Sequence, residues 1–474
     1  MDFDKDLAAR QEARTLCRQA QAAQKQLSEF SQSQLDTIVE SVAKAFSAAA
    51  VELAELAVRE TGFGNSQDKV TKNRFASERV AATIRGQTCV GLLREDPKDR
   101  IWEFGVPVGV ICAIVPSTNP TSTVCYKSLI ALKSGNAVVF SPHPKALSCT
   151  LRAAQIVAEA AEKAGAPKGC ISCLSLASMA GCQELMAAEE VRLILATGGP
   201  AMVKSAYSSG KPAIGVGAGN GPAYIHKSAD VTAALQHILR SKTFDNGTVC
   251  ASEQSIILER TMAEQVEQTA KKLGFYFLNP HEAAKVAQLL FRPTGALNPE
   301  IVGRTALHIG KLAGLALPAD TKILVAREEG VGVKYPYSME KLCPVLAFYV
   351  AENEDAVLDK AMEILRHEGA GHTFSLHTED RAVVEKFAAA MPVSRFLVNT
   401  PAALGGIGAT TNLFPALTLG CGAVGGSASS NNIGPMDLIN VRRVAWDVEE
   451  SQPKIHVDHD LVELLTQKIL ERLQ

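Results

Sequence analysis

The hydrophobic and polar positions of the chain follow a helical period near the N-terminus and a mixed pattern of strands and helices after it. Within residues 35–60 the apolar side chains recur every three or four positions, as on the buried face of a helix. These side chains are Leu35, Ile38, Val39, Val42 and Phe46. The segment TGFG that follows them predicts a helix end. We therefore expect the first hundred residues to be mostly helical.

Short runs rich in β-branched residues begin near residue 105 and alternate with helical segments. The runs VGVICAIVP (108–116) and NAVVF (136–140) are typical of strands that are buried on both faces. The segment TSTVCYKSLIALKSG between them has a helical pattern. Continued alternation over residues 105–220 predicts a doubly wound parallel sheet.

The alternation resumes after residue 250 and predicts a second α/β unit. The last apolar segment of the chain, LVELLTQKILERL, predicts an amphipathic helix. We expect this helix to dock on its own subunit or on another one. A targeting or encapsulation tail is the alternative.

Composition and charge exclude several classes of partner. The 474 residues carry 48 basic and 50 acidic side chains, so there is no basic excess to neutralise nucleic-acid phosphates. No apolar run approaches the ~20 residues that span a bilayer, and the N-terminus has no apolar signal core. The odd number of cysteines, 11, lacks the regular spacing of a disulfide framework, which indicates a reducing, cytoplasmic setting. We assign the CxxC pair Cys170 and Cys173 to strand packing rather than to a metal or redox site.

One cysteine stands at the junction of a helical segment and an apolar run. Cys250, in TFDNGTVCASEQS (243–255), follows DVTAALQHILRSK and precedes SIILE. Its small and polar neighbours leave room around the sulfur, and the adjoining backbone would present N–H groups to it, as an activated thiolate requires. A cysteine in a glycine-containing turn can also be inert. The local pattern leaves both interpretations open.

Three further segments follow predicted strands. Asn119, in VPSTNPTSTV, would serve there as a donor to an oxyanion or as a helix cap. Gly198 and Gly199, in ATGGPAMVKSA, would let a dinucleotide approach a helix N-terminus. The segment GVGAGNGP (215–222) is too rich in glycine for an ordinary strand end and predicts close approach of its backbone by some other group.

Together these motifs resemble those of the CoA-acylating aldehyde dehydrogenases. The group includes the aldehyde dehydrogenase half of bifunctional aldehyde–alcohol dehydrogenases, and acylating succinate-semialdehyde and sulfoacetaldehyde dehydrogenases. The matching segments run in order from about residue 100 to residue 445. They are VPSTNPTSTVCYKSLIALKSGNAVVFSPHPKA, ATGGPAMVKSAYSSGKPAIGVGAGNGP, TFDNGTVCASEQS, EKLCPVLAF and TLGCGAVGGS.

The resemblance implies an α/β fold of the aldehyde dehydrogenase type, with a Rossmann-type cofactor domain and a second α/β catalytic domain. We accordingly divide the chain into three parts. Residues 1–225 would hold the N-terminal helices and the dinucleotide-binding domain, and residues 226–420 the catalytic domain. Residues 421–474 would return to the cofactor domain and supply an oligomerisation segment and the C-terminal helix.

The resemblance also assigns roles to individual residues. Cys250 would be the nucleophile, and Asn119 would form the oxyanion hole with the Cys250 N–H. His372, in GHTFSLHT, would transfer a proton or position the thiol, with a packed or capping histidine as the alternative. Glu340, which the sequence alone would make an ordinary surface acid, matches the glutamate that holds the nicotinamide ribose. No metal site is expected. The implied cofactor residues are Ser117, Ser141, His143, Thr197, Gly198, Gly199, Gly217 and Glu340.

Two departures from related enzymes refine the expected reaction. Hydrolytic relatives carry a water-activating glutamate about where this chain has Val216, and no carboxylate occurs from Ala213 through Ala229. We therefore predict that a thiol rather than water takes the acyl group. The expected substrates are CoA, NAD or NADP, and a short-chain aldehyde that is either acetaldehyde-like or anionic, such as sulfoacetaldehyde. Ser141 replaces the superfamily lysine that contacts the adenosine ribose, so the preference between NAD and NADP stays open.

Other functions are weighed beside this one. A hydrolytic aldehyde dehydrogenase with a relocated base is the main alternative. A phosphate-dependent semialdehyde reductase and a non-catalytic scaffold or shell-cargo protein are more remote. By analogy we expect a homodimer or homotetramer. The loops 399–412 and 413–420 are expected to line the aldehyde pocket.

Overall fold

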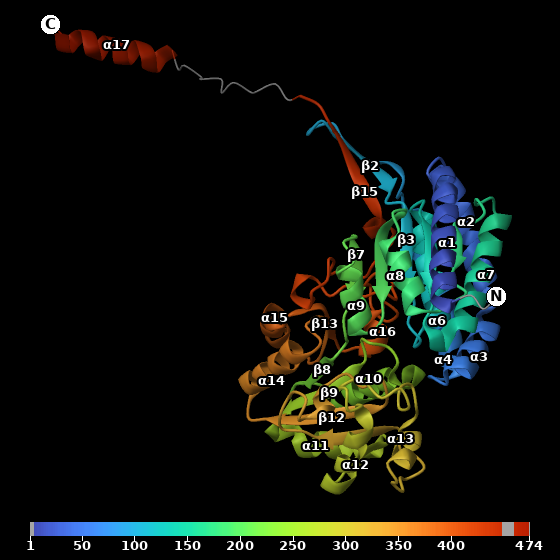
Figure 1. The fold of residues 1–474 in the computed structure, drawn as a ribbon. Helices are drawn as coiled ribbons and strands as arrows, with labels where there is room; N and C mark the ends of the chain where they lie inside the picture. Colours follow the sequence, from blue (N-terminus) through green and yellow to red (C-terminus); the bar gives the residue numbers. More distant parts are fainter. Residues whose placement is uncertain (1–3, 448–458, 474) are drawn as a thin grey trace.

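A computed structural model describes residues 4–447 and 459–473 of the chain. Figure 1 shows two α/β units side by side, with a small third sheet that projects from them. The first unit holds a five-stranded sheet and the second a seven-stranded sheet. The predicted α/β fold class is confirmed.

The N-terminal part is helical, as its apolar spacing predicts. The five apolar positions that carry this spacing are all buried within α2. The predicted stop is the end of α3, where Gly62 adopts a left-handed conformation at φ +69°. The helices are α1 (Lys5–Leu27), α2 (Gln32–Ala48), α3 (Ala50–Thr61), α4 (Ser66–Arg74) and α5 (Val80–Ile84), with a π-helical turn η1 (Phe75–Arg79) between the last two.

The first sheet consists of five parallel strands in the order β5-β4-β3-β6-β7. They are β3 (Val110–Ile114), β4 (Ala137–Ser141), β5 (Ile171–Cys173), β6 (Val191–Thr197) and β7 (Ala213–Val216). Their connecting helices are α6 (Pro120–Lys133), α7 (Leu147–Lys163), α8 (Met179–Ala187) and α9 (Pro200–Tyr207). The direction of winding reverses between β3 and β6, as in a Rossmann-type sheet. A ligand crevice is therefore expected at the carboxyl ends of these two strands.

The second sheet consists of seven parallel strands in the order β10-β11-β12-β9-β8-β13-β14. They are β8 (Gly221–Ile225), β9 (Glu253–Glu259), β10 (Phe275–Phe277), β11 (Ile323–Arg327), β12 (Val345–Ala351), β13 (Gly371–His377) and β14 (Val393–Val398). The accompanying helices are α10 (Val231–Thr243), α11 (Ala263–Lys272), α12 (Pro280–Leu290), α13 (Ala306–Leu312), α14 (Glu354–His367), α15 (Arg381–Ala390) and α16 (Ala402–Gly406).

Strand β9 shows why this sheet reads as uninterrupted apolar runs in the sequence. Ile256 and Leu258 pack into the core on one face of the sheet, and Ile257 packs into the core on the other face. Both faces are covered, so neither set of alternate positions needs to be polar. The central strands are consequently predictable, although the facing of each side chain is not.

The structure differs from the predicted division of the chain at two places. Strand β8 pairs with β9 and β13 in the second sheet, whereas the prediction places residues up to 225 in the first domain. Ala403 and Ile407 already pack in the core of the first unit, ahead of the predicted return at residue 421. The first difference arises because only residues 217–220 separate β7 from β8, so no helix marks the change of sheet.

A third sheet is antiparallel, with the order β1-β2-β15. Its strands are β1 (Gly91–Asp96), β2 (Ile101–Pro107) and β15 (Ile439–Ala445). The sequence patterns predict none of them. Trp102 and Trp446 pack edge to face at its outer end, with ring centroids 4.9 Å apart.

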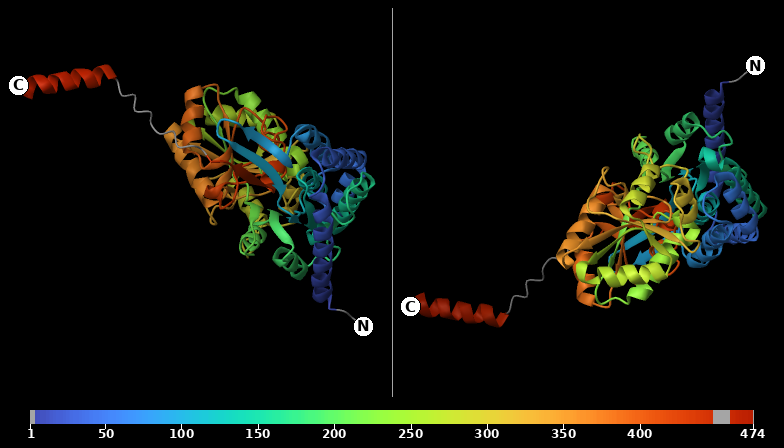
Figure 2. Two further views of the ribbon diagram at one scale, coloured as in Figure 1. Left: turned by 90° about the horizontal axis from the view of Figure 1, so that it is seen from above. Right: turned by 90° about the horizontal axis from the view of Figure 1, so that it is seen from below.

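The C-terminal helix α17 (His459–Leu473) lies apart from the two α/β units in Figures 1 and 2. It is amphipathic, as predicted, and its large apolar side chains are exposed. Among the described residues, no helix combines the length and apolar character that a membrane crossing requires.

Candidate active site

A cavity of about 540 Å³ opens between the two α/β units. Residues just beyond the carboxyl ends of β3, β6 and β7 form one wall, and the turn that leads into β9 forms another. This is the crevice that the order of the first sheet predicts.

Every residue predicted to bind the cofactor lines this cavity. They are Ser117, Ser141, His143, Thr197, Gly198, Gly199, Gly217 and Glu340. Gly199 begins α9 without a side-chain cap, which leaves N–H groups of the first turn available to an anion. A Cβ added at Gly199 or Gly217 would stand in open space rather than against protein atoms. The wall therefore has the shape and the donors to accept a dinucleotide phosphate.

Cys250 lies in the same cavity, half-buried, between the 3-10 turn η3 (Phe244–Gly247) and β9. The glycine-rich segment passes directly behind it. A Cβ on Gly219 would lie 1.9 Å from the Cys250 carbonyl oxygen, and one on Gly221 would lie 2.9 Å from the Thr373 carbonyl oxygen. The group that approaches this segment is therefore the backbone of the protein itself.

His372 lies behind Cys250 rather than on the cavity wall. Its Nε2 is 3.2 Å from the Cys250 Sγ, and its Nδ1 is 2.8 Å from the Thr373 Oγ1. With a proton on Nδ1, donated to the threonine, Nε2 is free to accept the thiol proton. Burial and the neighbouring Arg395 guanidinium hold the pKa of His372 well below its usual range, so the imidazole is neutral. The contact with the thiol favours the predicted role in proton transfer or thiol positioning over a packed histidine.

The thiol needs such a base. Burial, reinforced by the nearby Glu340 carboxylate, raises the pKa of Cys250 to about 12. The sulfur is consequently protonated at neutral pH, and a thiol is a weak nucleophile. A neutral imidazole within hydrogen-bond reach can remove the proton as the sulfur attacks.

The side chain of Asn119 does not cap α6, which removes the helix-cap interpretation. Its Nδ2 donates to the Thr118 Oγ1 at 3.2 Å and to the Thr248 carbonyl oxygen at 3.4 Å. Its Oδ1 accepts from the Lys72 Nζ at 2.6 Å. The two Nδ2 contacts are long, and the side chain lines the cavity beside Cys250. The amide can therefore turn a donor toward an oxygen that develops negative charge.

Glu340 lies in the cavity and not on the open surface that the sequence alone suggests. Its Oε1 accepts from the Gly219 N–H at 3.0 Å. Burial, together with the charge of Glu368, raises the pKa of Glu340 to about 7. It is the one acidic side chain that lines the cavity among the described residues. Val216, the position at which the resemblance leads one to expect the base of a hydrolytic enzyme, also lines the cavity.

Several cavity residues escape sequence reasoning. Lys72, from α4, and Arg292 line the cavity without belonging to any motif noted in the sequence. Lys145 also lines it and stands in the first matching segment, but the sequence assigns it no role. The clue for Lys72 is that α4 has no apolar face to bury, with polar residues throughout except Val70. Among the described residues, no group of three or more His, Cys, Asp or Glu side chains is arranged to hold a metal ion.

Comparison with known proteins identifies the family. The family model "Aldehyde dehydrogenase family" matches residues 5–274. The succinate-semialdehyde dehydrogenase (acetylating) of Clostridium kluyveri is 33% identical over 92% of this chain and 96% of its own length. The chain belongs to the aldehyde dehydrogenase family.

Other members of the family share more of the sequence. The bifunctional aldehyde-alcohol dehydrogenase AdhE of Escherichia coli is 44% identical over 92% of this chain, and this chain spans about half of that relative's length. An acetylating aldehyde dehydrogenase structure from Geobacillus thermoglucosidasius is 49% identical, with a TM-score of 0.93 over 95% of this chain and 100% of that one. A probable aldehyde dehydrogenase structure from Listeria monocytogenes is 55% identical, with a TM-score of 0.93 over 95% of this chain and 99% of that one. The resemblance to acylating aldehyde dehydrogenases is confirmed.

Two more distant aldehyde dehydrogenases have informative ligands or settings. A propionaldehyde dehydrogenase structure from Rhodopseudomonas palustris, 28% identical with a TM-score of 0.84 over 92% of this chain and 97% of that one, contains CoA and an acylated cysteine. A propionaldehyde dehydrogenase from a fucose-utilisation microcompartment of Clostridium phytofermentans is 27% identical, with a TM-score of 0.83 over 91% of this chain and 96% of that one.

Replacement of His372 by alanine should slow the first burst of reduced cofactor about 10²- to 10⁴-fold, the usual contribution of a positioned base. The physical reason is that the Cys250 thiol stays protonated without it. Stopped-flow measurement of the burst tests this. Cys250→Ala should abolish the burst, whereas His377→Ala, at another buried histidine of β13, should leave it unchanged. An unchanged burst in His372→Ala would contradict the role.

Replacement of Glu340 by glutamine should raise the KM for the dinucleotide about tenfold, roughly one hydrogen bond of binding energy. It should not change the ratio of free acid to thioester. Initial rates at varied dinucleotide concentration give the KM. Product analysis with and without CoA gives the ratio of free acid to thioester. Glu253→Gln is the matched control, because burial also raises the pKa of Glu253 to about 7 and Glu253 lies outside the cavity. Reduced acid release in Glu340→Gln would instead make Glu340 a water-activating base.

Proposed function

We propose that this protein oxidises a short-chain aldehyde with NAD or NADP and transfers the resulting acyl group to CoA. The observation that carries the proposal is the contact of the Cys250 thiol with the His372 imidazole, with the thiol in a cavity that has Val216 where a water-activating acid would be needed. The names of the relatives, which include acetylating and acylating dehydrogenases, support the same reaction.

In this proposal the side chains act in a fixed order. The Cys250 Sγ attacks the aldehyde carbon while its proton passes to the His372 Nε2. The Asn119 Nδ2 and the Cys250 N–H donate to the carbonyl oxygen as it becomes negative. When it is bound, the nicotinamide accepts the hydride of the aldehyde carbon. What remains on the protein is an acyl thioester of Cys250.

The second half of the reaction uses the same pair. His372, once its proton has passed to solvent, takes the proton of the CoA thiol as that sulfur attacks the thioester. It then returns a proton to the Cys250 sulfur, which is the leaving group. Water is a poor competitor, because the segment from Ala213 through Ala229, which passes behind Cys250, contains no carboxylate. Lys145 and Arg292 supply positive charge for the phosphates of CoA and of the dinucleotide.

The composition of the wall favours an apolar aldehyde over an anionic one. Ile407, Leu417 and Leu419 line the cavity. From the loop 399–412, Ile407 is the one residue that lines it, so the hydroxyl and glycine N–H donors of that loop do not face the ligand space. We therefore infer an acetaldehyde-like substrate rather than sulfoacetaldehyde.

Turnover of an aldehyde panel with and without CoA tests both parts of this proposal. Continuous reduction of the cofactor should require CoA and should yield acyl-CoA, and acetaldehyde or propionaldehyde should exceed sulfoacetaldehyde in kcat/KM. Full-rate reduction without CoA, with free acid as the product, would establish the hydrolytic alternative. A preference for sulfoacetaldehyde would overturn the substrate assignment alone.

We further infer that α17 binds a partner outside its own α/β units, and that this partner is the shell of a bacterial microcompartment. The helix presents apolar residues of 51–59% exposure, among them Leu464, Leu465 and Ile469. The microcompartment relative supports this choice of partner.

The eleven free cysteines support a reducing, cytoplasmic setting. The exposed edges of the third sheet support the predicted homo-oligomer.

The double variant Leu465→Glu/Ile469→Glu should lose co-sedimentation with assembled microcompartment shells and keep full turnover, because it removes the apolar stripe alone. A matched change on the polar face, Gln467→Glu, should keep co-sedimentation. Light scattering of the same proteins gives the oligomer mass. A lowered mass together with unchanged shell binding would make α17 a subunit contact instead.

A further inference from the structure

Helix α4 buries charge where other helices bury apolar residues. Its buried residues are Lys69, Lys72 and Asn73, and each is at most 3% exposed. Lysine is almost never fully buried unless it is paired. The positions i, i+3 and i+4 lie on one face of a helix, so the three side chains point the same way.

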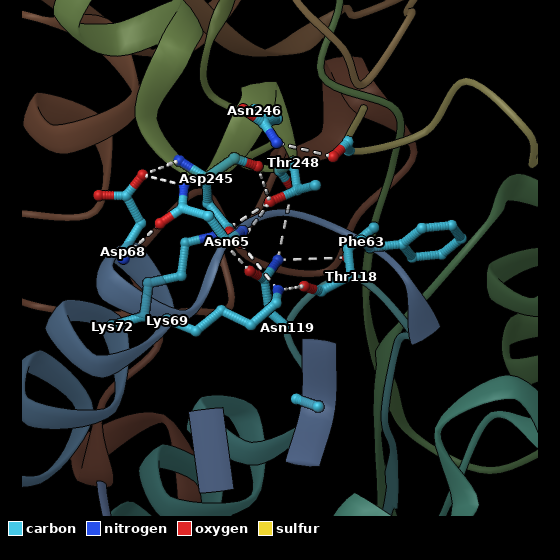
Figure 3. A network of polar contacts seen from close by, with 12 residues as sticks. Phe63, Asn65, Asp68, Lys69, Lys72, Thr118, Asn119, Asp245, Asn246 and Thr248 are labelled. Atoms are coloured by element: carbon cyan, nitrogen blue, oxygen red, sulfur yellow. Dashed lines mark hydrogen bonds and ion pairs between the residues drawn. The ribbon is translucent and has the colours of Figure 1, made fainter. Parts of the chain in front are cut away.

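That face holds the start of α6. The Lys69 Nζ donates to the Thr118 carbonyl oxygen at 2.9 Å, and the Lys72 Nζ donates to the Asn119 Oδ1 at 2.6 Å. The Asn73 Oδ1 accepts from the Thr121 Oγ1 at 2.8 Å. Figure 3 shows the first two side chains reaching from α4 to the turn that carries Asn119. One helix therefore fixes successive positions of that turn.

The counter-ion comes from the turn that precedes Cys250. The Asp245 Oδ2 lies 2.9 Å from the Lys69 Nζ and 2.6 Å from the Lys72 Nζ, and the carboxylate is fully buried. Asp245 adopts φ +47°, which is unfavourable for a residue with a side chain. The Asp68 Oδ2 accepts from the Asp245 N–H at 2.7 Å and helps to hold that conformation. A residue other than glycine is thus kept in a left-handed turn, with its carboxylate aimed at the two lysines.

The ammonium decides how the Asn119 amide is oriented. A lysine carries donors only, so the atom that it contacts must be the carboxamide oxygen. The Nδ2 is then necessarily on the other side of the amide. The Lys72 Nζ also donates to the Thr248 Oγ1 at 3.0 Å, which fixes its position between the turns of Asn119 and Cys250. A cation on the amide oxygen polarises the group and strengthens its N–H donors.

We propose that Lys72 is a positioning residue for the oxidation step: it holds the Asn119 carboxamide with its Nδ2 available to the oxyanion, and Asp245 holds Lys72 in place. The proposal rests on the proposed function, because it requires an oxyanion to form at Cys250. It adds to that function the requirement that a lysine of α4 orients the Asn119 carboxamide. No motif noted in the sequence indicates this requirement.

The charge state of Lys72 gives the proposal a pH signature. Burial lowers the pKa of Lys72 to about 8. The positive charge of Lys69 lowers this pKa further, and the negative charge of Asp245 raises it. The charged groups that face it are Lys69 and Asp68 from α4 and Asp245 from η3. The ammonium is therefore present below about pH 8 and is lost as the pH rises through that value. Above it, the hold on the carboxamide weakens.

The test is a double-mutant cycle on the burst of reduced cofactor measured without CoA. Lys72→Met should slow the burst about 10- to 100-fold, somewhat less than the 10²- to 10³-fold loss of an oxyanion-hole donor itself. The KM for the dinucleotide should change less than threefold. The double variant Lys72→Met/Asn119→Ala should be no slower than Asn119→Ala, because residues that act as one unit are not additive.

Lys133→Met is the matched control. Lys133 is a buried lysine at the other end of α6, ion-paired with Asp36. This variant should lose thermal stability and keep the full burst. Lys72→Gln, whose amide can still donate to the Asn119 Oδ1, should recover part of the rate lost in Lys72→Met. Cofactor binding, followed by fluorescence, reports that each variant is folded.

A second measurement needs no substitution of a buried lysine. The burst of the wild-type protein should fall as the pH rises above about 8, and this fall should disappear in Asn119→Ala. Multiplicative losses in the cycle, or a fall that persists in Asn119→Ala, would overturn the proposal. Because the burst precedes acyl transfer, a wild-type protein that shows a burst but makes no acyl-CoA would overturn the proposed function and leave this test intact.

Discussion

The partial burial of the Cys250 thiol at the cavity wall is the constraint on which the rest of the site depends. Burial and the neighbouring Glu340 raise the thiol pKa to about 12, so the sulfur rests in its protonated form. The same burial keeps His372 neutral, so the Nε2 that faces the thiol across the 3.2 Å contact carries a lone pair and no proton when Nδ1 is protonated. One environment thus sets the protonation states of both partners. It also means that a resting thiolate, exposed to chance oxidants and alkylating agents, is not maintained.

Much of the fold was predictable because it depends on local pattern. The helix α2 shows its apolar spacing in the sequence, and β3, β4 and β9 show the continuous apolar runs of strands that are covered on both faces. The cavity residues were predictable for a different reason. Turns at strand ends combine Gly, Ser, Thr and Asn in motifs of the family, and all eight predicted cofactor residues line one cavity.

The remaining features depend on contacts between distant parts of the chain. Lys72 and Asp245 are 173 residues apart, so nothing near either residue in the sequence indicates their pairing. The pairing of β15 with β2 also joins distant parts of the chain, as does the packing of Ala403 in the core of the first unit. His372 was found through its motif, but its position behind the sulfur required the packing of β13 against β8 and the turn of Cys250. The sequence indicates which chemistry is present more readily than which side chains support it.

All fourteen residues of α6 are buried, and of these fourteen only Thr123 lines the cavity. A helix packed in this way cannot slide without displacing the core atoms that surround it. In the proposed reaction the reduced dinucleotide must depart before CoA occupies the same space. We expect the passage to widen instead at Arg292 and Leu297, which line the cavity from a partly exposed connection between α12 and α13. Ligand exchange and the geometry of the oxyanion site would then depend on different parts of the molecule. Movement of the connection need not displace Asn119.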